Sequence, residues 1–262
     1  MSKVQDEEEL LFARESRLAM RRGEWTGVTQ FRARDQVLAN LVVVSKDLAY
    51  DFVVYCQRNP KPCPLIEILE PGDPEPRYSA PGADLRTDLA SYRVFREGEF
   101  EADVREIGDL WRDDSVAFLI GSSLSFDNAL ARAGVPYSPD VWVLNSSIPT
   151  RPSGKFSGNM VITMRWMSAE QAVIATQLTA RYYNNHGAPV HIGDPAAIGA
   201  DLENPIVGAP VERIPEGVVP VFWACGVTPQ VTLLGAKPDL LITHTPAHPF
   251  MCDLKVDRIC LP

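Results

Sequence analysis

The stretch "SVAFLIGSSLSFDNALARAG", from Ser115 to Gly134, decides the predicted fold class. Its first part is a continuous apolar run, which is typical of a buried strand. Ser125 can then cap a helix that Gly134 ends. A strand that leads directly into a helix indicates an α/β protein, and other parts of the chain repeat this order.

The same order extends on both sides of this stretch. Upstream, residues 40–44 predict a buried strand, and Ser45 can cap a helix that runs to Asn59. Downstream, Ser168 and Gln171 predict a capping box for another helix. Residues 218–226 form the most apolar predicted strand, and a helix capped by Thr228 follows it. A hairpin is expected to turn at residues 97–98.

The middle of the chain has an element order of its own. Residues 113–204 read as β-α-β-β-α-β, which resembles a split βαβ unit with two layers. We therefore predict that 113–204 form an inserted two-layer α/β sandwich domain. The main α/β domain would consist of residues 1–112 and 205–262.

Composition and charge exclude several classes of protein. The 262 residues carry a net charge of −9 and contain no basic run, which argues against binding to nucleic acid or to an anionic membrane. No apolar run approaches the roughly 20 residues of a membrane helix, and the first residues are acidic rather than signal-like. Five cysteines without a CxxC spacing predict free thiols in a cytoplasmic protein. Whether the protein forms a homo-oligomer stays open.

The segment "HGAPVHIGDP" holds two of the four histidines. His186 and His191 are five residues apart, so a regular strand would point them in opposite directions and make them poor ligands for one metal. His191 is predicted at a strand end, where α/β proteins place ligands. Asp194 either caps the short helix that Pro195 opens or belongs to the site.

Two further segments carry candidate groups at predicted strand ends. In "FWACGVTPQ", Cys225 is either a nucleophile with a pKa lowered by the following helix or a packing residue. The backbone at Gly226 and Thr228 could receive an anion. In "THTPAHPF", Pro246 argues against a helix, so the spacing of His244 and His248 is weak evidence for zinc.

Polar loops supply the remaining candidates. "GSSLSFDN" places Ser122 and Asp127 after a strand, but it has no GK[ST] and is not a P-loop. "RPSGKFSGNM" contains Lys155, which either grips a carboxylate or lies in a solvated turn. Asp253 follows the last histidine-containing loop. We predict that His186, His191, Asp194, Cys225, His244 and Asp253 line one cleft.

Several long motifs resemble the bacterial hydro-lyase family that is related to D-glutamate cyclase of animal mitochondria. They include "VVYCQRNPKPCPLIEI", "WRDDSVAFLIG", "HGAPVHIGDPAAIG", "VPVFWACGVTPQ" and "ITHTPAHPFMCD". The resemblance implies one three-layer and one two-layer α/β module. It implies a lyase that acts on a small carboxylic or amino acid, as in the conversion of D-glutamate to 5-oxo-D-proline and water. This chain departs from the family pattern at Ser122, Asp127 and Thr150, where the resemblance leads us to expect Cys, Glu and Cys.

Lactam formation of this kind needs a base for the amine, protonation of the leaving oxygen and a grip on the second carboxylate. His191 is the expected proton-transfer group, with Asp194, His186 and Cys225 as further catalytic candidates. Arg165 or Lys155 would hold a carboxylate, and a divalent metal such as Mn²⁺ or Mg²⁺ is an alternative activator. Two other functions stay open: a small-carboxylate binding protein without turnover, and a metal-dependent lactam or amide hydrolase.

Overall fold

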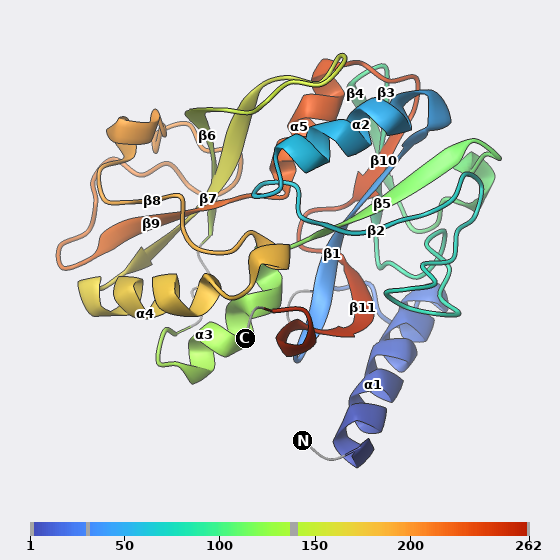
Figure 1. The fold of residues 1–262 in the computed structure, drawn as a ribbon, viewed down its shortest axis with the longest axis horizontal. Helices are drawn as coiled ribbons and strands as arrows, with labels where there is room; N and C mark the ends of the chain where they lie inside the picture. Colours follow the sequence, from blue (N-terminus) through green and yellow to red (C-terminus); the bar gives the residue numbers. More distant parts are fainter. Residues whose placement is uncertain (1–2, 30–31, 137–140, 261–262) are drawn as a thin grey trace.

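The computed structural model describes residues 3–29, 32–136 and 141–260, and in this part of the chain two β-sheets are surrounded by five α-helices (Figure 1). The predicted α/β class is confirmed. The strand pairs recorded within the two sheets are all antiparallel. Neighbouring strands therefore end at opposite edges of a sheet, and strand ends do not converge as they do in a parallel α/β fold.

The larger sheet has seven strands in the order β2-β5-β1-β10-β3-β4, with β11 also paired to β1. The strands are β1 (Gln36–Ser45), β2 (Leu65–Ile68), β3 (Tyr92–Arg96), β4 (Glu99–Val104), β5 (Ser115–Gly121), β10 (Leu241–His244) and β11 (Phe250–Lys255). β1 is central because β5 pairs along one side of it while β10 and β11 share the other. Nine of its ten residues are buried, as its apolar sequence predicts.

The smaller sheet has the order β6-β7-β9-β8. Its strands are β6 (Trp142–Pro149), β7 (Asn159–Met167), β8 (His191–Ile192) and β9 (Val219–Ala224). The sheets therefore divide the chain differently from the predicted boundaries near 113 and 204. β5 lies inside the predicted insertion but pairs with β1 in the larger sheet, and β9 lies outside the insertion but pairs with β7. Whether each sheet belongs to a separate domain stays a prediction.

Four of the helices cover the two sheets. α2 (Lys46–Arg58) and α5 (Val227–Gly235) pack on one face of the larger sheet through a cluster that includes Phe52, Tyr55 and Leu233. α3 (Asp127–Arg132) and α4 (Ala169–Thr179) lie next to each other beside the smaller sheet (Figure 1). The capping box at the start of α4 is confirmed. The caps predicted at Ser125 and Thr228 are wrong, because both hydroxyls bond to the backbone of neighbouring strands instead.

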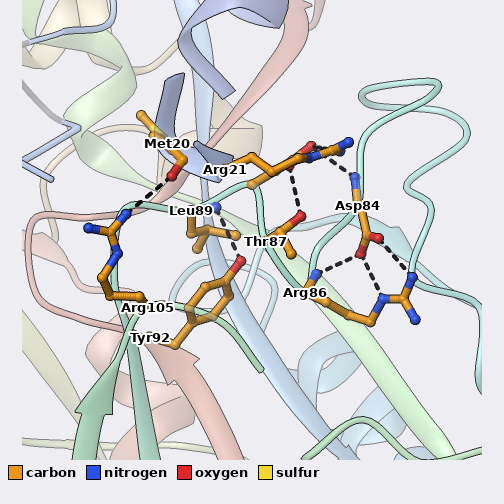
Figure 2. Close-up of polar contacts among 9 residues, drawn as sticks. Met20, Arg21, Asp84, Arg86, Thr87, Leu89, Tyr92 and Arg105 are labelled. Atoms are coloured by element: carbon orange, nitrogen blue, oxygen red, sulfur yellow. Dashed lines mark hydrogen bonds and ion pairs between the residues drawn. The ribbon is translucent and has the colours of Figure 1, made fainter. Parts of the chain in front are cut away.

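The remaining helix, α1 (Lys3–Arg21), contacts β11 and is held at its C-terminal end by an ion pair. Arg21 forms a two-fold ion pair with the buried carboxylate of Asp88, at 2.6 and 2.8 Å. Asp88 also accepts from the backbone N–H of Asp84, whose own carboxylate holds Arg86 (Figure 2). The proline-rich loop before β3 is therefore ordered by charge-assisted hydrogen bonds rather than by regular structure.

Candidate functional site

The end of β5 in the larger sheet contacts η3 (Tyr183–Asn185), which precedes β8 of the smaller sheet. The backbone approaches so closely here that a side chain at Gly121 would collide with the carbonyl of Asn184. A side chain at Gly226, before α5, would likewise collide with Asn40, which donates to the Gly121 carbonyl. Asn185, fully buried, donates to the carbonyl of Ser122. Glycines at these positions allow segments that are distant in sequence to touch.

A cavity of about 620 Å³ lies beside this junction. It is lined by the end of α2 with the proline-rich turn that follows, by the first residue of β2, and by the segment after α4. Among its lining residues are Gln57, Lys61, Tyr183, Asn184 and His186. Its volume falls within the roughly 300–1,000 Å³ of small-molecule sites.

Lys61 and His186 join the two walls of this cavity through reciprocal hydrogen bonds. The ammonium of Lys61 donates to the carbonyls of His186 at 3.1 Å and Ala188 at 2.6 Å. The imidazole Nδ1 of His186 lies 2.9 Å from the carbonyl of Lys61. Because a carbonyl only accepts, this contact assigns the proton to Nδ1 and leaves a lone pair on Nε2.

The remaining nitrogen of His186 is unusual. Nε2 is buried without a hydrogen-bond partner, and the residue is only 1% exposed. Burial lowers the pKa of His186 from 6.5 to about 4, so the imidazole is neutral at pH 7. Its backbone has φ 76°, a left-handed conformation that is uncommon for residues other than glycine. An unsatisfied acceptor on a strained backbone is a feature of functional sites.

Lys61 is the second polar group of the cavity. Its ammonium has three N–H donors, and the two carbonyls use two of them. Burial lowers the pKa of Lys61 below its usual value. No site role was predicted for Lys61 from the sequence. The signal that could have identified it is its place between Pro60 and Pro62, which hold it in a turn at a helix end.

The structure joins two predicted residues, Asp127 and Arg165, in a buried ion pair of 2.6 Å. The guanidinium also lies over the rings of Phe126 and Trp223. The cavity beside the pair has a volume of about 10 Å³, which is room for one water. A glutamate-sized molecule does not fit there, so the pair acts as a link between β7 and the start of α3.

His191 and Cys225 lie on opposite faces of the smaller sheet. His191 pairs with Phe222 and stacks near its ring, whereas Cys225 packs with Val161 on the other face. The predicted single cleft for these two residues is therefore wrong. Of the two alternatives for Cys225, the structure supports the packing residue, because burial raises the pKa of the thiol instead of lowering it.

Asp194 accepts from the N–H of Ala196 and caps η4 (Pro195–Ile198), as the structural alternative predicted. Its carbonyl also accepts from Nε2 of His191 at 2.8 Å. Both side chains thus have partners within their own loop. Their predicted catalytic roles stay predictions.

The other predicted residues are dispersed. Ser122 caps η2 (Ser123–Phe126), and Thr228 bonds to the backbone of Val161. Lys155 is exposed in the loop between β6 and β7. Asp253 is paired with Arg17 at 2.7 Å, and burial raises its pKa. Burial lowers the pKa of His244 to about 4.

The described residues contain no group of three or more histidine, cysteine, aspartate or glutamate side chains arranged to hold a metal ion. The divalent metal therefore stays a prediction without a donor set in this part of the chain. Within the same residues, no helix is both long enough and apolar enough to span a membrane.

The two antiparallel sheets, their helices and the cavity at Lys61 and His186 define a mixed α/β protein with a small-molecule-sized site. The model of the D-glutamate cyclase family matches residues 116–253. The chain belongs to this family.

Curated relatives match over nearly their whole length. One from Stutzerimonas stutzeri, named "Putative hydro-lyase", is 49% identical over 92% of both chains. One of the same description from Thermoanaerobacter sp. strain X514 is 49% identical over 94% of both chains. A nitrogen repressor-like protein from Methanococcus jannaschii aligns over 87% of this chain and 90% of its own with 12% identity and a TM-score of 0.39, which is too low to bear on function. The relatives' names support a lyase.

Proposed function

We propose that the protein is a hydro-lyase of small amino acids that closes D-glutamate to 5-oxo-D-proline with loss of water, in the cavity between Lys61 and His186. The observation that carries the proposal is the buried, unpartnered Nε2 of His186. Family membership supports the reaction class. The size of the cavity is sufficient for the substrate.

The bond changes assign a task to each group. The substrate amine enters as an ammonium and its γ-carboxyl group as a carboxylate. Nε2 of His186 accepts a proton from the ammonium, and the freed amine attacks the γ-carbon. The carbon–nitrogen bond forms, the carbon–oxygen bond breaks, and the two protons lost by nitrogen leave with oxygen as water. The imidazole returns the first of them to the leaving oxygen.

Lys61 would orient the substrate. Its third N–H is available for a carboxylate, and a charge-assisted hydrogen bond inside a cavity is stronger than one in water. An anionic substrate would also raise the pKa of His186 toward neutrality, because a nearby negative charge favours the imidazolium. The higher pKa makes His186 a better base when substrate is bound.

The test is incubation of the purified protein with D-glutamate, L-glutamate and 5-oxo-D-proline, with and without Mn²⁺ or Mg²⁺, followed by mass spectrometry. We expect 5-oxoproline from D-glutamate. Binding of D-glutamate without conversion would identify a carboxylate-binding protein instead. Metal-dependent conversion of 5-oxo-D-proline to glutamate as the main reaction would identify a hydrolase.

A further inference from the structure

The cavity is larger than the proposed substrate requires. Glutamate has about ten non-hydrogen atoms and fills on the order of 150 Å³, about five water volumes of about 30 Å³ each. The cavity measures about 620 Å³. The excess space adjoins apolar surface, since Pro60, Pro64, Leu65, Ala180 and Ala188 also line it. This lining fits a substrate with an uncharged group attached to the amino-acid part.

The lining also suits the transfer of a single proton. His186 is the one imidazole among the described lining residues, which include no aspartate or glutamate. Loss of water from the zwitterion delivers two protons to the leaving oxygen. Closure of a γ-amide also begins with an ammonium that loses two protons, but only one of them goes to the leaving nitrogen, and the other is released to solvent. A single base that returns one proton to the leaving nitrogen is therefore sufficient to release the amine.

We infer that this site also cyclises γ-glutamyl amides that carry an apolar substituent, and releases the substituent as an amine. The inference rests on the proposed function, because it uses the same attacking amine and the same base. The α-ammonium loses two protons as its nitrogen bonds to the γ-carbon and the γ-carbon–nitrogen bond breaks. One proton passes through Nε2 of His186 to the leaving nitrogen, and the other is released to solvent. The products are 5-oxoproline and a free amine. A neutral amide carbon accepts a nucleophile more readily than a carboxylate carbon does.

The probe is D-γ-glutamyl-4-nitroanilide, with its L-enantiomer beside it and a protein-free control. Release of 4-nitroaniline is followed by absorbance, and 5-oxoproline from D-glutamate is measured by mass spectrometry in parallel. We expect kcat/KM for the D-anilide to exceed that for D-glutamate by about tenfold or more, since the larger group fills the apolar space.

Two tryptophan variants locate the activity. Ala180 is exposed and lines the cavity, so Ala180→Trp should fill the apolar space without disturbing the core. It should lower kcat/KM for the anilide by about tenfold, and by more than it lowers kcat/KM for D-glutamate. Val173 is 58% exposed on α4, which ends one residue before Ala180, and does not line this cavity, so Val173→Trp is the matched control with no expected effect.

The outcomes separate the two claims. Cyclisation of D-glutamate without release of 4-nitroaniline would overturn the inference and leave the proposed function standing. Release of 4-nitroaniline without conversion of D-glutamate would support the inference and overturn the proposed loss of water. Absence of both reactions would overturn both. Equal anilide activity in Ala180→Trp and Val173→Trp would place the reaction outside this cavity and overturn the inference.

Discussion

His186 and His191 stand five residues apart in one motif, yet their surroundings differ in every respect that matters for chemistry. His186 is buried on a left-handed backbone, bonds across the chain to Lys61 and keeps one nitrogen without a partner. His191 is half-buried, bonds within its own loop to the Asp194 carbonyl, and lies against Phe222. His191 uses Nε2 for its hydrogen bond within the protein, whereas His186 uses Nδ1.

This difference teaches that strand position is a poor guide to a site in an antiparallel fold. His191 was the expected base because a strand end in a parallel sheet faces the ligand crevice. Here β8 is a two-residue edge strand antiparallel to β9. The large cavity instead lies where loops from α2 and α4 meet.

The largest expected effect comes from His186→Asn. Asparagine tolerates the left-handed backbone and can place an N–H where Nδ1 lies, but it removes Nε2. We expect kcat for cyclisation of D-glutamate to fall by about 10²–10⁴-fold, the usual range for loss of an acid–base group. Circular dichroism before the assay confirms folding. A folded variant with unchanged kcat would contradict the role of His186.

The second effect is on the pH dependence of stability. Between pH 6.5 and about 4 the unfolded chain protonates this imidazole while the folded protein keeps it neutral, so stability falls as the pH decreases. The difference between a pKa of 6.5 in the unfolded chain and about 4 in the folded protein corresponds to about 3 kcal/mol. The His186→Asn variant should lack the loss of stability that His186 causes below pH 6.5, and it should keep the loss that His244 causes. Urea unfolding at a series of pH values measures it, and identical slopes for both proteins would show that the shift is absent.

A smaller effect is expected for His191→Ala. The variant loses one hydrogen bond and the contact with Phe222, so the free energy of unfolding should decrease by about 1–2 kcal/mol. The kcat per folded molecule should stay within about twofold. A stable but inactive His191→Ala protein would reverse the roles that we assign to the two histidines.

The smallest effect is expected for Asp194→Ala. It removes the cap of the short η4 helix at an exposed position and should cost about 0.5–1 kcal/mol. Activity should not change, and thermal unfolding measures the cost. A large loss of activity at normal stability would return Asp194 to the list of catalytic groups.

Local signals predicted the elements well but not their partners. The hairpin turn at Glu97–Gly98, the capping box of Ser168 and the cap at Asp194 were all readable, because each depends on residues within one turn of chain. β11 was missed, since its pairing with β1 involves residues more than 200 positions away. For the same reason the sheets divide the chain differently from the predicted boundaries, because element order does not reveal which strands pair.

The sequence by itself determined the α/β class, the buried strands and the family, because apolar runs, caps and long motifs are local properties of the chain. Only the tertiary structure decided that the strand pairs of the described residues are antiparallel and that Lys61 contacts His186 across 125 positions of sequence. The tertiary structure also decided which charged groups form ion pairs, as Arg165 does with Asp127 and Arg17 does with Asp253. Burial and ion pairing shift pKa values and occupy hydrogen-bonding groups. Both effects depend on contacts between segments that are distant in the sequence.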